Sequence, residues 1–146
     1  MADKQNQDYS AGLDSVQASF SMAGRVPERY SPLPDLSWTE FLSWLLGRRS
    51  RYRIEGNSMA PTLNPGDEIF YTPVVETASL QIGAIVIAKH PLRSELRLIK
   101  RIAALEATGC WLLGDNQPQS TDSRSFGWVE LDQLQGIATC RFYSAS

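Results

Sequence analysis

The chain has 146 residues, enough for one domain with a sizeable core and too few for two full domains. Hydrophobic residues make up 42% of it and charged residues 21%, a balance typical of a folded globular protein rather than a disordered or collagen-like one. The 14 Lys and Arg against 16 Asp and Glu give a formal net charge of -2, so nucleic acid is not an expected partner.

Residue types that hold metals are scarce. Cys110 and Cys140 are too few for the disulfide scaffold of a small secreted protein, and His90 is the single histidine. No Cys-x-x-Cys or His-x-x-x-His spacing occurs, so we expect neither a metal site nor a cofactor. The sequence has no secretory signal and no apolar stretch near the roughly 20 residues that cross a bilayer. We therefore expect a cytoplasmic protein without a transmembrane span.

Residues 1–36 are rich in polar residues and proline without a lasting apolar period, and we expect them to form a flexible polar leader. Ser37 followed by Glu40 is a capping box, which predicts a short amphipathic helix over 37–47. Its apolar stripe consists of Trp38, Phe41, Leu42, Leu45 and Leu46. Either this stripe packs on the core or, helped by the arginines at 48, 49 and 51, it contacts a membrane surface or a partner.

From residue 50 the apolar period changes to two, and turns rich in Pro, Gly, Asn and Asp separate the apolar runs. This pattern predicts strands over 51–55, 67–72, 84–89, 96–105, 110–113, 128–131 and 135–143. We therefore expect a mainly β domain over 50–146, an antiparallel barrel or folded sheet with the helix at its N-terminal edge.

Three motifs carry residues with catalytic potential. They are Gly-Asn-Ser-Met-Ala-Pro-Thr-Leu at 56–63 with Gly-Asp at 66–67, Leu-Ile-Lys-Arg at 98–101, and Gly-Asp-Asn at 114–116 leading to Ser-Thr-Asp-Ser-Arg at 120–124. Alone, each could be a turn, a solvated strand lysine or a polar loop. Their joint occurrence in this order favours a catalytic site.

A serine nucleophile without a useful histidine needs another base, and lysine is a known one. The pKa of lysine must then fall from about 10.4 to roughly 7 to 8, which burial among apolar groups achieves. Lys100 fits, because the residues around it are apolar and the alternation of a strand directs Arg97 and Arg101 to the opposite face. Lys89, at the end of a predicted strand, is a weaker alternative.

Ser58 is the corresponding nucleophile. The preceding strand breaks at Gly56, where a substrate backbone can approach closely. A serine in such a turn exposes its hydroxyl, and its backbone N–H can contribute to an oxyanion hole.

The series of motifs resembles the type I signal peptidase family of Ser-Lys endopeptidases over roughly residues 51–140, which implies a fold like that of signal peptidase and LexA. The resemblance implies that Ser58 is the nucleophile and Lys100 the general base, with Ser120 orienting the lysine amine. It further implies a loop-bracing ion pair between Asp122 and Arg124, and a place for Gly56 and Met59 along the substrate groove. Because Gly56 carries no hydroxyl, the oxyanion hole would consist of backbone N–H groups.

The short spacing between Ser58 and Lys100 and the absence of an anchor make the chain more similar to the proteases that mature nickel-type superoxide dismutase. That resemblance implies a protein precursor as partner, from which a leader is removed so that a histidine becomes the new N-terminus. Two alternatives stay open: a Ser-Lys autoprotease of the repressor-switch type, and a non-catalytic β-barrel binding module. The sequence does not define the oligomeric state, and it leaves room for peripheral membrane contact.

Overall fold

A computed structural model describes residues 32–145, so most of the predicted leader over 1–36 lies outside the described residues. The strands are β1 (Ser50–Arg53), β2 (Glu68–Pro73), β3 (Ile85–His90), β4 (Arg93–Leu105), β5 (Gly109–Leu113), β6 (Val129–Glu130) and β7 (Leu134–Tyr143). The described helices are α2 (Trp38–Leu45), α3 (Ser123–Phe126) and three 3-10 turns, η1 (Thr77–Ser79), η2 (Gln117–Gln119) and η3 (Leu131–Gln133). Each strand overlaps one that the sequence predicts, and the mainly β fold class is confirmed.

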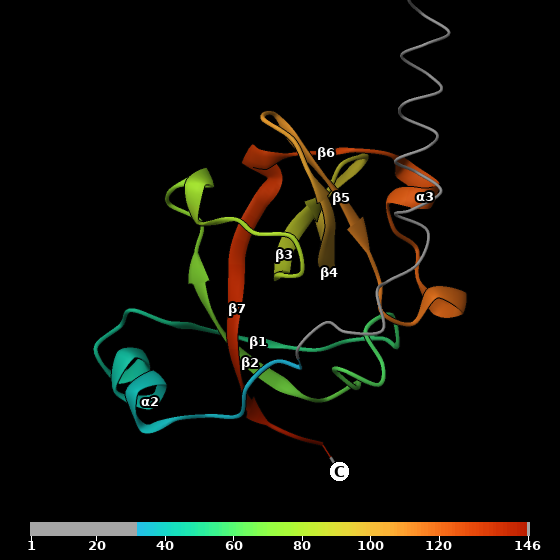
Figure 1. Cartoon of the computed structure of the whole chain (residues 1–146). Helices are drawn as coiled ribbons and strands as arrows, with labels where there is room; N and C mark the ends of the chain where they lie inside the picture. Colours follow the sequence, from blue (N-terminus) through green and yellow to red (C-terminus); the bar gives the residue numbers. More distant parts are fainter. Residues whose placement is uncertain (1–31, 146) are drawn as a thin grey trace, which may run out of the picture.

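All seven strands belong to one sheet in the order β1-β2-β7-β3-β4-β5-β6, and every neighbouring pair is antiparallel. Figure 1 shows the long β7 running through the middle of the molecule. Since β1 and β6 do not pair with each other, the sheet is strongly folded but its hydrogen bonding does not close into a barrel. The barrel expectation is corrected in this respect.

β3 separates two apolar clusters. Its alternation directs Ile85 and Ile87 into the first cluster and Val86 and Ala88 into the second. The first cluster also contains Ile54, Met59, Leu63, Ile69, Ile99 and Ala138, and the second contains Leu80, Ile102, Cys110, Leu112, Val129 and Leu134. A strand with core on both faces has no polar face, which explains the unbroken apolar run in β3.

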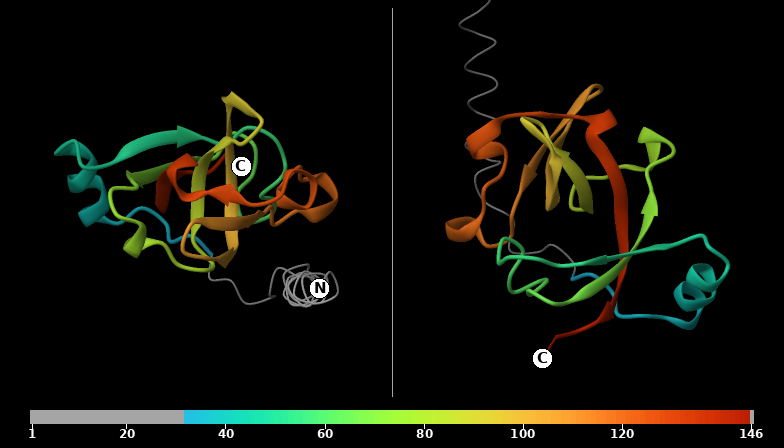
Figure 2. Two further views of the ribbon diagram at one scale, coloured as in Figure 1. Left: turned by 90° about the horizontal axis from the view of Figure 1, so that it is seen from above. Right: turned by 180° about the vertical axis from the view of Figure 1, so that it is seen from behind.

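Helix α2 begins as the sequence predicts, because the Ser37 hydroxyl accepts a hydrogen bond from the backbone N–H of Glu40 at 3.3 Å. Its contact with the sheet comes from Trp44, which the predicted stripe does not include: Trp44 stacks on Phe70 with ring centroids 5.7 Å apart. The other side of the helix faces outward, with exposed fractions of 40% to 73% for Leu42, Leu45, Leu46 and Trp38. α2 and α3 lie on opposite sides of the molecule (Figures 1 and 2).

The last residues before α2 are attached to the sheet. Asp35 forms an ion pair with Arg141 of β7 at 2.8 Å, and the carbonyl of Pro34 accepts a hydrogen bond from the Arg141 backbone N–H. Leu33 packs against the first apolar cluster. Within residues 32–145, no helix combines the length and apolar character needed to span a bilayer.

Candidate active site

The loop between β1 and β2 positions Ser58. Ile54 anchors its start, since its backbone N–H donates to the carbonyl of Asp67 and its carbonyl accepts from Gly66. Gly56 has a φ of +77°, which allows the chain to turn away from the strand direction. Ser58 is half-buried, whereas its neighbour Met59 is fully buried in the first apolar cluster. Met59 therefore anchors the turn in the core, and its place along the substrate groove stays a prediction.

Lys100 lies in β4 and is only 4% exposed. Among residues 32–145 the Lys100 amine has neither a hydrogen bond nor an ion pair. Burial lowers the pKa of Lys100 to about 8, the negative charge of Asp122 opposes this shift, and Arg124 reinforces it. The amine thus loses its proton far more readily than an ordinary solvated lysine does.

Gly114, directly after β5, brings the predicted site residues together. Arg101 pairs with Leu113 at the end of the β4–β5 ladder, so an antiparallel register continued by one residue would set Lys100 opposite Gly114. A side chain added at Gly114 would come within 2.6 Å of the Ser58 carbonyl oxygen and would clash with the Ser120 hydroxyl. Ser58, Lys100 and Ser120 are therefore gathered around a position where only glycine fits.

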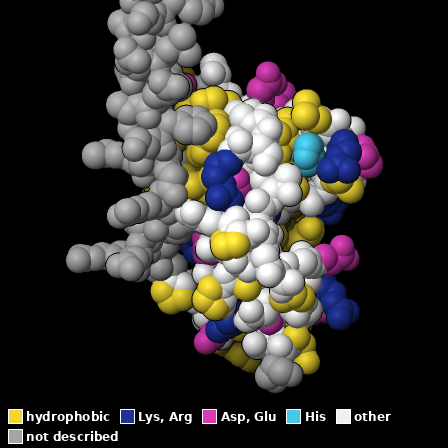
Figure 3. Space-filling view, turned by 90° about the vertical axis from the view of Figure 1, so that its right-hand side faces the viewer, with side chains coloured by type: hydrophobic (Ala, Val, Ile, Leu, Met, Phe, Trp, Pro, Cys, Tyr) yellow, Lys and Arg dark blue, Asp and Glu magenta, His cyan; other side chains and the backbone are white. Residues whose placement is uncertain are grey.

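Further hydrogen bonds hold the Ser58 loop against the segment after β5. The backbone N–H of Asn116 donates to the Ser58 carbonyl at 2.9 Å, and the Asn116 side chain donates to the carbonyl of Asn57 at 3.0 Å. Figure 1 places this loop, in green, beside the orange segment that leads into α3. On the side of the molecule that carries this segment, basic, acidic and apolar side chains are interspersed (Figure 3).

The buried carboxylate of Asp122 organises the loop that carries Ser120. It accepts hydrogen bonds from the Ser120 hydroxyl at 2.7 Å and from the backbone N–H of Gly114 at 3.0 Å, and it forms an ion pair with Arg124 at 2.9 Å. Burial alone would raise the pKa of Asp122, but the bonds from Arg124, Gly114 and Ser120 outweigh it and leave that pKa lowered. The Ser120 hydroxyl therefore donates to Asp122 and keeps its lone pairs for another donor.

Sequence reasoning missed a second buried ion pair. Arg101, directly after Lys100, is 3% exposed and forms two hydrogen bonds with the Asp115 carboxylate, at 2.7 and 2.9 Å. Thr62 of the Ser58 loop donates to the same carboxylate at 2.6 Å. Asp115 thus joins the loop of the nucleophile to the strand of the lysine. The adjacent Gly-Asp-Asn and Lys-Arg motifs were the available sequence evidence.

We expect Gly114→Ala to lower both stability and activity. The new methyl group would meet backbone at Ser58 as well as the Ser120 side chain, and overpacking of this kind costs roughly 1 to 3 kcal/mol. Urea denaturation measures the loss of stability, and peptide turnover measures the misalignment. The matched control is Gly109→Ala, where the nearest atom would be 3.1 Å away and a smaller loss is expected. Equal, small effects at both glycines would contradict this account.

The family profile described as "Signal peptidase, peptidase S26" matches residues 44–109 and 105–143. The chain therefore belongs to this family of peptidases. Similar proteins include mitochondrial inner membrane protease subunit 2 of Mus musculus, which is 34% identical over 110 residues that cover 60% of this chain and 63% of the relative. Subunit 1 of the same organism is 32% identical over 102 residues, covering 56% of this chain and 61% of the relative.

A mitochondrial ATP-independent inner membrane protease subunit 2 of Arabidopsis thaliana is 29% identical over 108 residues, covering 58% of this chain and 53% of the relative. The matched region thus spans less than two thirds of each of these relatives. The predicted cytoplasmic location is wrong by this comparison, because the relatives are named as proteases of the mitochondrial inner membrane. The physical reason is that proteins also reach membranes through amphipathic surfaces, so a missing span does not define the compartment.

Proposed function

We propose that this chain is a serine endopeptidase in which Ser58 is the nucleophile and Lys100 the general base. The observation that carries the proposal is the buried Lys100 amine, which has no ion pair within residues 32–145 and which the β4–β5 register sets near the place where Gly114 meets Ser58 and Ser120. A buried lysine without a carboxylate partner costs stability, and a lysine that serves as a general base must be neutral to take the serine proton. Ser120 is the positioning residue, since its hydroxyl oxygen can accept a hydrogen bond from the amine.

The neutral Lys100 amine takes the proton from Ser58 as Oγ bonds to the scissile carbonyl carbon. Backbone N–H groups of the Ser58 turn stabilise the oxyanion. When the C–N bond breaks, the leaving amine takes the proton from Lys100, and an acyl ester remains on Ser58. Water then attacks the ester carbonyl carbon and gives a proton to Lys100. As the bond from that carbon to Ser58 Oγ breaks, Oγ takes the proton from Lys100, the carboxylic acid product leaves and both side chains are restored.

We expect peptide turnover to rise with pH along a limb whose apparent pKa is about 8. The reason is that only the neutral Lys100 amine accepts the Ser58 proton, and burial lowers its pKa to about 8. Initial rates measured between pH 6 and 10 check this expectation. Ser120→Ala should reduce the rate roughly 10²- to 10⁴-fold, because the amine loses the hydroxyl oxygen that orients it. A wild-type limb near pH 10 would contradict a buried base.

The substrate class we propose is a precursor protein with an extended leader. The resemblance to nickel dismutase maturation proteases makes that precursor the first to test, although the relatives named above carry no mention of it. Incubating the two purified proteins and reading the precursor N-terminus by mass spectrometry should reveal a new terminal histidine. The chain incubated alone controls for self-cleavage. An uncut precursor, with cleavage of a short peptide retained, would reject this substrate and leave the peptidase standing.

We also propose that the exposed side of α2 contacts a membrane surface. Three observations support this membrane contact: the outward apolar side chains of α2, the arginines at 48, 49 and 51, and the names of the relatives. Leu45→Asp should reduce cosedimentation with anionic phospholipid vesicles several-fold without a change in stability, since Leu45 is 64% exposed. Leu92→Asp is the control, because Leu92 is 78% exposed outside α2. Equal binding by all three proteins would overturn the proposal.

A further inference from the structure

A second surface feature lies apart from the proposed catalytic residues. It is a groove of about 620 Å³ between the segment after β2, the β4–β5 hairpin and the segment from β6 to β7. We call it the acidic groove and define it by Val74, Val75, Glu130, Leu131, Asp132 and Leu134. None of Ser58, Lys100 or Ser120 lines it.

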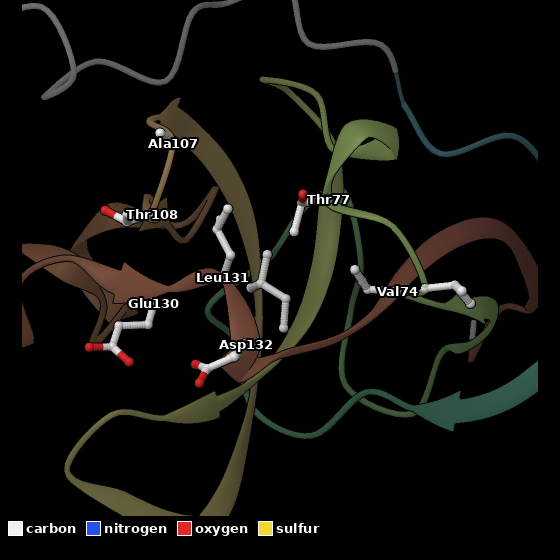
Figure 4. Close-up of a pocket in the computed structure, with 9 residues that line it drawn as sticks. Val74, Thr77, Ala107, Thr108, Glu130, Leu131 and Asp132 are labelled. Atoms are coloured by element: carbon white, nitrogen blue, oxygen red, sulfur yellow. The ribbon is translucent and has the colours of Figure 1, made fainter.

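The acidic groove combines an apolar floor with a charged wall. Figure 4 shows the carboxylates of Glu130 and Asp132 on one side, Val74 and Thr77 on the other, and Leu131 between them. Val75, which also lines the groove, is 86% exposed and adds apolar surface that a ligand in the groove could contact. The groove therefore offers contact to a ligand that is partly apolar.

The charge around the groove has one sign. The three segments that form it, residues 73–88, 102–114 and 125–140, contain no lysine or arginine. They do contain Glu130 and Asp132 in the wall, and Glu76 and Glu106 beside lining residues. Among residues 32–145, none of these four carboxylates takes part in an ion pair. A chain of net charge -2 thus concentrates four unneutralised negative charges here.

This combination selects one kind of occupant. An anionic ligand would be repelled, and a neutral apolar ligand would leave the carboxylates without partners. Lysine and arginine side chains carry an apolar stem and a cationic head, which match the floor and the wall. We propose that the acidic groove docks a cationic amphipathic segment of a partner protein, in which basic and apolar residues are neighbours. The proposal concerns binding and does not depend on the Ser-Lys chemistry.

The test measures binding of a fluorescent peptide of alternating leucine and arginine to the full chain carrying Ser58→Ala, so that cleavage cannot interfere. The groove variant combines Glu130→Gln with Asp132→Asn. The control variant combines Glu55→Gln with Glu95→Gln, which removes the same charge from exposed positions outside the groove. We expect the groove variant to weaken binding roughly tenfold at low salt and the control variant to weaken it less than twofold.

The location of binding is read separately. Backbone amide NMR shifts should change at residues 74–77, 107–108 and 130–134 and remain constant around Ser58 and Lys100. A peptide in which glutamine replaces arginine should bind much more weakly. Equal weakening by the groove and control variants, equal binding of the glutamine peptide, or shifts confined to the Ser58 loop would each overturn the proposal. Turnover of a short neutral peptide by the groove variant with Ser58 restored should equal that of the wild type, which separates this result from a failure of the peptidase proposal.

Discussion

Replacing Ser58 by alanine or Lys100 by methionine is expected to reduce peptide cleavage by roughly 10⁴-fold or more. The two side chains serve one proton transfer, so the double variant should be no slower than either single variant. Turnover of a short peptide by purified proteins measures both effects. Lys89→Met is the control. Lys89 is exposed and lies in β3 opposite Arg97, away from the Lys100 pair, so its replacement should leave turnover nearly unchanged.

The same Lys100 variant should gain stability while it loses activity. A folded-state pKa of about 8 against an ordinary 10.5 means that the unfolded chain holds this proton more tightly. The resulting penalty is absent above pH 10.5 and fully present below pH 8, so methionine removes up to about 3 kcal/mol at pH 7. Urea denaturation at pH 7 measures it. Wild-type turnover by Lys100→Met would show that another group is the base. A marked loss of stability in this variant would contradict the cost assigned to the buried Lys100 charge.

Asp122→Asn is expected to be the most destabilising polar substitution in the site, at about 2 to 4 kcal/mol. Asp122 is fully buried and accepts hydrogen bonds from Ser120, Gly114 and Arg124. The asparagine amide keeps the shape of the Asp122 side chain but loses its negative charge. Its NH₂ group would also face hydrogen-bond donors in place of an acceptor oxygen. The loss stays below that for a fully buried pair because Arg124 is 34% exposed.

The pH dependence of this effect has a defined sign. Since the folded-state pKa of Asp122 is lowered, its contribution is present above the unfolded pKa of about 3.9 and is lost as pH falls further. The stability difference between wild type and Asp122→Asn should therefore shrink below pH 4, as measured by urea denaturation across pH 3 to 7. Glu95→Gln, at an exposed carboxylate, should change stability little at any pH. A constant difference over this range would contradict the assigned role of the charge.

The strand positions could be predicted from sequence because alternation and turn residues are local properties. Strand order could not, since nothing local indicates that β7 lies between β2 and β3. The sequence also could not predict which side of α2 contacts the sheet. Trp44 stacks on aromatic residues of β2 and β7, whereas Trp38 and Leu45 are exposed.

The site residues Ser58, Lys100 and Ser120 could be named from their motifs, and a lowered lysine pKa could be argued from apolar neighbours. The role of Gly114 could not be predicted, because it depends on the segments of Ser58, Gly114 and Ser120 meeting at one point. Arg101 was correctly placed on the face away from Lys100, but the burial of that face and its partner Asp115 are tertiary properties. The acidic groove likewise depends on segments far apart in sequence.

The central place of β7 has a consequence for when the peptidase can become active. Ser58 belongs to the part of the sheet made of β1 and β2, and Lys100 to the part made of β3 to β6. Only β7 joins these parts by strand pairing, and it is the last strand to be synthesised. Without residues 134–143, the hydrogen bonds of Asn116 and Asp115 to the Ser58 loop would have to hold the two parts together without any strand pairing between them. In the proposed peptidase, the alignment of Ser58 with Lys100 therefore depends on the strand that is made last of the seven.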